Sequence, residues 1–228
     1  MRVRAARYLG AAKKAISALK DYYQNVLPDI HNSVPARRPN PEFPYPTKYT
    51  SLAELTIQPF EYLSQLEPGK LVFCGKAAGN LICIKFARQY SKETHLECTS
   101  LGFAPALRGF ETLAGGWSMV VMDYLGDEYE LLANSPVQAS FLPEVREKVI
   151  SLHQLGYVHG DIRTTNIMVK KSGEPGVMFI DFDWAGIIGT VRYPMNVNTE
   201  EIKRPDGAID GELIVAEHDM AMVDFLSL

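Results

Sequence analysis

A cluster of prolines is the strongest constraint on how this chain can fold. Residues 28–48 hold six of the 14 prolines, Pro28, Pro35, Pro39, Pro41, Pro44 and Pro46. Proline fixes φ and has no backbone N–H, so this density excludes a regular helix or a central strand. We therefore predict a linker or an extended strap at residues 28–48, and Phe43, Tyr45 and Tyr49 indicate that it lies on a surface.

The segment before these prolines has the pattern of an amphipathic helix. Residues 1–20 carry six basic and no acidic residues. Apolar side chains recur there at helical spacing: Val3, Leu9, Ala12, Ile16, Leu19 and Tyr23. Two interpretations remain open, a helix packed on the main domain and a mitochondrial presequence, and the scarcity of serine favours the first.

Length and composition indicate one globular domain with an appendage. The 228 residues are 46% hydrophobic and 22% charged with a net charge of −4, so nucleic acid is not an expected partner. No run of 18 apolar residues occurs, so no membrane span is expected. Cys74, Cys83 and Cys98 show no C-x-x-C spacing, which predicts reduced thiols and an intracellular protein of the cytoplasm or nucleus.

In the rest of the chain, strand-like and helical patterns follow one another in an order that predicts an α+β fold. Strand-like runs, which read as three hairpins, occur at residues 71–76, 81–86, 104–113, 117–125, 167–170 and 177–182. Helical patterns occur at residues 89–101, 143–155 and 216–226. Pro143 suits the first turn of the second of these helices. This order predicts a small sheet with one helix, followed by a mainly helical part with one small hairpin.

The polar segment "VHGDIRTTNIMV", residues 158–169, is unusual for a simple connection. It places Asp161 and Asn166 five positions apart, directly before a strand-like run. Fifteen residues after Asn166 comes Asp181 of "IDFD", and far upstream "ICIK" places Lys85 at the end of a strand. Each of these residues alone would usually be a turn residue, a cap or a solvated strand end. Taken together and in this order, they predict a reaction centre.

These motifs resemble those of protein kinase-like phosphotransferases. The kinase pattern H-R-D-L-x-x-x-N is met by His159, Asp161 and Asn166, with Gly160 in place of arginine. "IDFD" stands at the position of D-F-G, and "ICIK" at that of V-A-I-K. "HGD" is typical of aminoglycoside phosphotransferases and of RIO-type and tRNA-modification-associated atypical kinases. The motifs are also similar to those of small kinase-like proteins abundant in mushroom-forming fungi.

The resemblance implies a two-lobed protein kinase-like fold. Its N-lobe, at about residues 65–125, would be a small sheet with one helix. Its C-lobe, at about residues 126–228, would be shortened and mainly helical. The kinase-like domain would then cover residues 61–228, and residues 1–60 would form a helical and proline-rich extension.

The resemblance also implies a reaction, the transfer of the γ-phosphoryl group of ATP, with Mg²⁺, to a hydroxyl of serine, threonine or a small molecule. Such a transfer spreads negative charge over the phosphoryl oxygens, so the protein must position groups and neutralise charge. Asp161 would accept the proton of the attacking hydroxyl, and Lys85 would hold the α and β phosphates. Asn166 and Asp181 would bind Mg²⁺ through oxygen atoms.

Further roles follow from the same resemblance. Glu93 is the expected acidic partner of Lys85, with Glu97 as the alternative, and Arg163 would contact the transferring phosphate. The other assignments are Met122 as gatekeeper, the main chain of Asp123 and Leu125 as the adenine-binding hinge, Asp219 as a brace of the catalytic loop, and His153 and His159 as structural residues.

Departures from the kinase pattern keep other interpretations open. "VFCGKAAGNLI" contains only Gly75 and Gly79, so the glycine-rich phosphate loop is missing. Asp183 replaces the glycine of D-F-G and adds a carboxylate near the metal position. No A-P-E motif follows. The alternatives are an inactive pseudokinase that binds a nucleotide or a protein, and one piece of a larger assembly.

Overall fold

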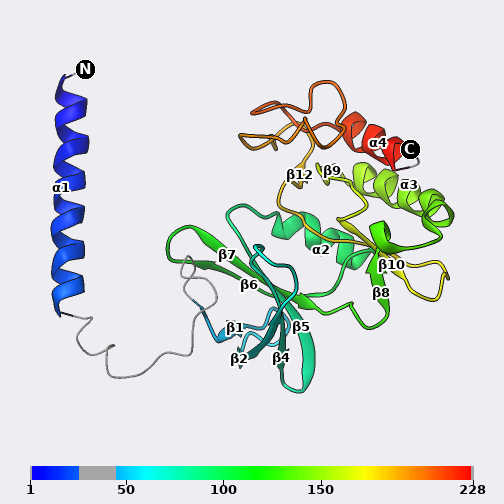
Figure 1. Ribbon diagram of the computed structural model, residues 1–228, viewed down its shortest axis with the longest axis horizontal. Coiled ribbons are helices and arrows are strands. Elements are labelled where there is room, and N and C mark those ends of the chain that lie inside the picture. Colours follow the sequence, from blue (N-terminus) through cyan, green and yellow to red (C-terminus); the bar gives the residue numbers. More distant parts are fainter. Residues whose placement is uncertain (1, 26–44, 227–228) are drawn as a thin grey trace. The chain divides into compact units, whose positions relative to one another are not determined.

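The computed structural model describes residues 2–25 and 45–226, which fall into two units, Met1–Glu42 and Phe43–Leu228 (Figure 1). The first unit contains α1 (Arg2–Asn25), in agreement with the helical spacing of its apolar residues. The part of the predicted strap at residues 28–44 lies outside the described residues. In the part of the chain that the structure describes, no helix is both long and apolar enough to cross a membrane.

A five-stranded antiparallel sheet forms one half of the second unit. Its strands, in spatial order, are β3 (Glu61–Gln65), β4 (Val72–Ala77), β5 (Asn80–Ala87), β7 (Trp117–Asp123) and β6 (Leu107–Leu113). A two-residue turn joins β4 to β5, and Ala78 and Gly79 have φ angles of 48° and 88° there. Positive φ at both positions matches the right-handed twist of a hairpin. This hairpin and that of β6 with β7 confirm the two predicted from the sequence.

Two short strands outside this sheet extend its aromatic core. β1 (Lys48–Thr50) pairs with β2 (Ile57–Pro59), and Ser51 bridges to Gly109 of β6. Tyr49 is 7% exposed and lies so close to Gly109 that a Cβ atom there would stand 2.4 Å from the tyrosine ring. The glycine therefore makes room for the tyrosine. The sequence analysis placed residues 48–59 in the extension, whereas the structure places them in the second unit.

One helix accompanies the sheet. α2 (Lys92–Ser100) is shorter at both ends than the predicted helix at residues 89–101. It begins after Ser91, whose hydroxyl accepts a hydrogen bond from the Thr94 amide at 3.3 Å, as serine commonly does at an N-cap. The cap fixes the start of the helix, and the buried face of α2 consists of Thr94, His95 and Cys98.

The other half of the unit contains two longer helices, which lie side by side (Figure 1), and two small sheets. Its elements are β8 (Tyr129–Leu131), the 3₁₀ helix η2 (Leu132–Asn134), α3 (Gln138–Gln154), β9 (Tyr157–Val158), β10 (Ile167–Lys170), β11 (Val177–Phe179), β12 (Gly186–Ile187) and α4 (Ala216–Phe225). β8, β10 and β11 form one sheet, and β9 pairs with β12. The mixed α+β fold expected from the sequence is confirmed.

The predicted start of α3 at residue 143 was wrong. Pro143 lies inside the helix and not in its first turn. Phe141, which is 2% exposed, anchors an earlier turn in the core. Together with Val145, Val149 and Leu152 it forms an apolar stripe at helical spacing.

The predicted strand at residues 177–182 was too long. β11 ends at Phe179, and two residues later Asp181 has a φ of 69°. This left-handed conformation interrupts a strand, and aspartate adopts it more readily than most residues. The turn that follows β11 therefore leaves the sheet with its carboxylates free to meet other segments.

Candidate active site

Lys85 lies on the face of β5 that is turned away from the aromatic core of the sheet. Because side chains alternate along a strand, Ile84 and Phe86 enter that core and Lys85 points to the opposite side. The Lys85 side chain is 11% exposed, and its Nζ donates to Oδ1 of Asp181 and to Oδ1 of Asp183, each at 2.6 Å. A lysine of the sheet thus meets both carboxylates of "IDFD".

The partners of Lys85 differ from the expected ones on α2. Glu93 is exposed, and among the described residues the ion pairs of Lys85 are with Asp181 and Asp183. Neither Glu93 nor Glu97 belongs to the buried face of α2. The position of the N-cap determines this, because it sets which residues of the helix turn inward.

The two carboxylates have pKa values that shift in opposite directions. Burial would raise the pKa of Asp181, but the charge and the hydrogen bond of Lys85 outweigh burial, and the pKa is lowered from its ordinary value. Burial raises the pKa of Asp183 to about 7, with repulsion by Asp181 adding to burial and Lys85 opposing it. Asp181 is therefore the carboxylate that stays charged, as a metal ligand must.

Asn166 connects the polar loop after β9 to the turn after β11. Its Nδ2 donates to Oδ2 of Asp161 at 2.8 Å and to the Asp161 carbonyl at 3.0 Å. The main-chain carbonyl of Asn166 accepts a hydrogen bond from the main-chain amide of Ile180, next to Asp181, at 3.0 Å. The structure thus joins Lys85, Asp181, Asn166 and Asp161 in one network, in which the main chain of Ile180 links the Lys85–Asp181 pair to the Asn166–Asp161 pair.

Asp219 of α4 holds the loop that carries Asp161. The Asp219 side chain is 1% exposed and accepts hydrogen bonds from the amides of His159 at 2.7 Å and Gly160 at 2.8 Å. Gly160 has a φ of 81°, and a Cβ atom there would lie 2.8 Å from the Trp184 carbonyl. Glycine is therefore required at the centre of "HGD", and the predicted brace by Asp219 is present.

Phe182 is held between two histidines. Its ring stacks on His95 with centroids 4.7 Å apart, and the His159 ring lies at 5.3 Å. Burial lowers the pKa of His95 to about 4, so this ring is neutral. Because the Pro105 carbonyl can only accept, Nε2 of His95 carries the proton at 2.8 Å from that oxygen. His159 Nε2 donates to the Ile180 carbonyl at 3.1 Å, in agreement with its predicted structural role.

Two arginines cover the carboxylate of Asp161. Nη2 of Arg163 donates to Oδ2 at 2.7 Å, and Nη2 of Arg204 donates to Oδ1 at 2.9 Å. The Arg204 side chain is 3% exposed and lies over the Trp184 ring at 4.6 Å. The sequence analysis missed Arg204, because residues 195–213 have no periodicity or motif that assigns a role to it.

The predicted hinge begins in the last residues of β7, which ends at Asp123. Met122 is buried against Leu107 and Val120, and the Asp123 carboxylate pairs with Arg108 through two hydrogen bonds, at 2.5 and 3.0 Å. The Asp123 amide donates to the Ala106 carbonyl at 3.0 Å. The Leu125 carbonyl accepts from the Tyr129 amide at 2.9 Å, which turns the chain towards β8.

The donor set suits Mg²⁺ only together with a phosphate ligand. Among the described residues, no group of three or more histidine, cysteine or acidic side chains could hold a metal ion. Asp181 and Asp183 offer two carboxylates beside Lys85, and the main chain of Asn166 is bonded to that of Ile180, next to Asp181. Mg²⁺ is usually bound by one or two carboxylates plus substrate phosphates, so these residues fit a nucleotide-bound Mg²⁺.

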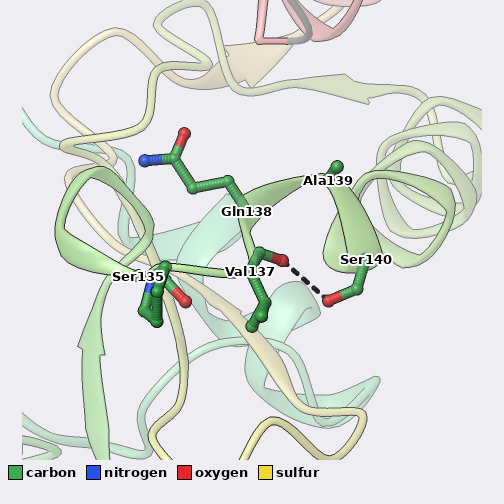
Figure 2. Close-up of a pocket in the computed structure, with 6 residues that line it drawn as sticks. Ser135, Val137, Gln138, Ala139 and Ser140 are labelled. Carbon is green, nitrogen blue, oxygen red and sulfur yellow. Dashed lines mark hydrogen bonds between the residues drawn. The ribbon is translucent and has the colours of Figure 1, made fainter.

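A pocket at the start of α3 is separate from this network. It has a volume of about 450 Å³ and is lined by Ser135–Ser140 (Figure 2). In it, the Ser140 hydroxyl donates to the Val137 carbonyl at 2.7 Å. Its lining comes from one continuous segment and includes none of the residues around Lys85 and Asp161, so it is not the candidate site.

Two known proteins show what this chain is similar to, one in sequence and one in structure. No family model matches the chain. Over 84 residues the chain is 33% identical to Citron Rho-interacting kinase of Mus musculus, a match that covers 37% of this chain and 4% of that protein. The structure of the Cydia pomonella granulovirus kinase PK-1 superposes with a TM-score of 0.58 and 19% identity, covering 72% of this chain and 65% of that chain.

The chain thus spans less than two thirds of the length of each of these two proteins. The superposition includes nearly three quarters of this chain, 72%. The described residues have the small antiparallel sheet with one helix and the helical second half that the sequence motifs imply. The fold of this protein is therefore protein kinase-like.

Proposed function

We propose that this protein is a phosphotransferase that moves the γ-phosphoryl group of ATP, with Mg²⁺, to a hydroxyl of serine, threonine or a small molecule. The network of Lys85, Asp181, Asn166 and Asp161 is the main support, because it joins an ammonium, two carboxylates and an amide from separate segments. The unpaired cysteines, Cys74, Cys83 and Cys98, support the proposed intracellular location.

In this proposal each residue has one task. Bound Mg–ATP supplies the phosphoryl group and a cation that neutralises its charge. Lys85 holds the nucleotide phosphates, and oxygen atoms of Asn166 and Asp181 bind the cation. Asp161 accepts the hydroxyl proton, and Arg163 lies beside it to neutralise the phosphoryl group.

The adenine would be held at the hinge. Met122 would limit the depth of its site, and the main chain of Asp123 and Leu125 would meet the edge of the base. This assignment rests on the place of Met122 and Asp123 at the end of β7, next to β5, and of Leu125 directly after it.

We also propose that Asp183 positions Lys85 in place of Glu93. Both Asp181 and Asp183 bond to Nζ. When Asp181 binds a cation, Asp183 is the carboxylate that keeps the ammonium oriented. Asp183 therefore takes the task that a helix glutamate has in protein kinases.

The second candidate function is a pseudokinase that binds a nucleotide or a protein. Two observations favour it. The connection between β3 and β4, residues 66–71, contains Gly69 as its single glycine, and both Asp161 oxygens are bonded to arginines.

The two functions are distinguished by measuring nucleotide binding and phosphoryl transfer on the same set of variants. Mg–ATP binding is measured by calorimetry, and transfer from radiolabelled ATP to a pool of serine and threonine peptides or to small alcohols. We expect Asp161→Ala to bind Mg–ATP but to lose transfer by at least about a hundredfold. Asp181→Ala should lose the Mg²⁺ dependence of binding.

Matched variants complete the test. Asp224→Ala removes a carboxylate that is 62% exposed and bonded to Arg146, so both properties should stay as in the wild type. Asp183→Asn should weaken ATP binding, whereas Glu93→Gln should not. Binding without any Asp161-dependent transfer would establish the pseudokinase, and absence of binding would exclude both functions that use a nucleotide.

A further inference from the structure

Arg204 is presented to the site by a loop that is held at its base. Asp210 accepts hydrogen bonds from the amides of Asn196 at 2.9 Å and Val197 at 2.8 Å. Near the same point, the Tyr193 amide donates to the Glu212 carbonyl at 2.9 Å. These bonds close the segment from residue 196 to 210, so the position of Arg204 within it is defined.

The guanidinium of Arg204 is oriented from three sides. Its Nε donates to the Asn198 carbonyl at 3.2 Å, and its Nη2 donates to Asp161 at 2.9 Å. Its carbon Cζ lies 4.6 Å from the centre of the Trp184 ring. A flat cation stacked on an aromatic ring keeps its plane, and with it the direction of its N–H groups.

One nitrogen of this guanidinium is buried without a partner. Nη1 of Arg204 has no hydrogen-bond partner among the described residues, although the side chain is only 3% exposed. Nε of Arg163, on the other side of Asp161, is buried and without a partner in the same way. A buried donor left unpaired destabilises a protein, so such donors usually mark a place that a ligand or water fills.

The charges at Asp161 leave a local excess of positive charge. One carboxylate faces two guanidiniums, of Arg163 and Arg204. A guanidinium binds carboxylate or phosphate through two parallel hydrogen bonds. Arg204 uses only one of its two Nη atoms on Asp161, so an anion that bonded to both would bind it more completely.

We propose that Arg204 binds an anionic group, a carboxylate or phosphate, that the phosphoryl acceptor carries next to its reactive hydroxyl. The inference rests on the proposed phosphotransferase function. When the anion binds to Nη1 and Nη2 of Arg204, the hydrogen bond from Nη2 to Oδ1 of Asp161 is replaced by a hydrogen bond to the anion. Oδ1 is then free to accept the proton of the hydroxyl. Arg204 thereby selects acidic or phosphorylated acceptors and uncovers Asp161 only when one is present.

The first test measures anion binding without nucleotide. Calorimetry with inorganic phosphate is carried out on the full chain and on Arg204→Gln, Arg204→Lys, Asp161→Asn and Lys85→Met. We expect Arg204→Gln to weaken binding by about tenfold or more and Arg204→Lys to weaken it less. Asp161→Asn should tighten binding several-fold, because the carboxylate that competes for Arg204 has lost its charge.

Matched variants identify the site of binding. Arg146→Gln removes an exposed arginine that also pairs with a carboxylate, and it should bind phosphate as the wild type does. Thermal unfolding of each variant shows whether it is folded. Three results would overturn the inference: no saturable binding by the wild type, equal binding by Arg204→Gln, or loss of binding in Lys85→Met alone, which would place the phosphate in the nucleotide site.

The second test measures acceptor selection. Serine peptides flanked by acidic residues are compared with peptides flanked by the matching amides, and glycerol 3-phosphate with glycerol. For whichever pair of acceptors is phosphorylated, the wild type should use the anionic acceptor with a kcat/KM about tenfold higher than that of the neutral one. Arg204→Gln should lose this preference because its KM for the anionic acceptor is raised. Equal use of both members by the wild type would overturn the inference. If no acceptor is phosphorylated, the proposed function fails, and the phosphate measurement still decides whether Arg204 binds anions.

Discussion

Asp183 stands where the kinase pattern has glycine, and it gives the site a second carboxylate within bonding distance of one lysine. Lys85 cannot neutralise both Asp181 and Asp183, so one of them is held against repulsion. As a result, the pKa of Asp181 is lowered and the pKa of Asp183 is raised. Folding therefore favours the protonated form of Asp183.

The raised pKa of Asp183 predicts how the stability of the folded chain depends on pH in the absence of nucleotide and Mg²⁺. The pKa of Asp183 is about 7 in the folded chain and has an ordinary value of 3.8, so the folded state binds more protons than the unfolded state between these values. Stability due to this group is thus complete below pH 3.8, still partly present at pH 5, and lost as pH rises through about 7. Because the side chain is 32% exposed, solvent screening reduces the expected loss to about 1–2 kcal/mol.

Chemical denaturation of the wild type and of Asp183→Asn at pH 5 and pH 8 checks this prediction. The difference in unfolding free energy between the two proteins should change by the stated amount, with Asp183→Asn gaining relative stability at pH 8. The prediction would be contradicted if the difference in unfolding free energy between the two proteins were the same at pH 5 and pH 8. Asp224→Asn serves as the control, because that carboxylate is largely exposed.

The residues of the site were predictable to different degrees. Lys85, Asp161, Asn166 and Asp181 could be chosen for the candidate site because "ICIK", "HGDIRTTN" and "IDFD" resemble three kinase motifs in the same order. The partner of Lys85 could not be chosen, since it depends on which face α2 turns inward. Arg204 reaches Asp161 from 43 positions away through an irregular loop, and local sequence carries no information on such a contact.

At the scale of elements, α4 is divided into two faces with different tasks. Asp219 on its buried face bonds to two backbone amides of the "HGD" loop. Asp224 on its exposed face pairs with Arg146 of α3. The buried face therefore supports the loop and packs in the core with α3, whereas the exposed face adds one ion pair to α3.

This division predicts that substitutions of Asp219 and Asp224 in α4 lower the free energy of unfolding by different amounts. Asp219→Ala leaves two buried amides without acceptors and should lower the free energy of unfolding by about 3 kcal/mol. Asp224→Ala removes an exposed ion pair and should lower it by less than about 1 kcal/mol. Urea denaturation of the two variants measures both values. Equal losses would mean that Asp219 does not hold the loop.

Elements with a strong pattern were predicted, and those without one were not. The β4–β5 and β6–β7 hairpins contain strongly apolar runs separated by short turns that contain glycine. β3 was missed because most of its side chains are exposed and show no alternation. Pro143 gave the wrong start for α3, since a proline is tolerated inside a helix whose preceding turn is anchored by Phe141.

At the scale of the whole molecule, the boundary of the kinase-like domain depends on β1 and β2. Tyr49 and Phe60 belong to the aromatic core that also contains Phe73 and Phe86 of the sheet. The second unit begins at Phe43. We propose that the domain begins there and not at residue 61, the boundary taken from the motifs.

Two truncations test this boundary. A chain that begins at residue 43 keeps the aromatic core and should unfold cooperatively, with a midpoint close to that of the full chain. A chain that begins at residue 61 lacks Tyr49 and Phe60, and the loss of two buried aromatic side chains should cost roughly 3–5 kcal/mol each. Thermal unfolding followed by circular dichroism measures both. Equal midpoints would restore the boundary at residue 61.

The hydrogen bonds from Asp219 to the "HGD" loop also have a consequence for synthesis on the ribosome. Asp219 and His159 are 60 positions apart, so the loop leaves the exit tunnel well before the helix that supports it. A nascent chain can form its sheet early, yet it cannot set the geometry around Asp161 until residues 216–225 have emerged. The order of translation thus delays the final arrangement of this loop until nearly all of the described fold exists.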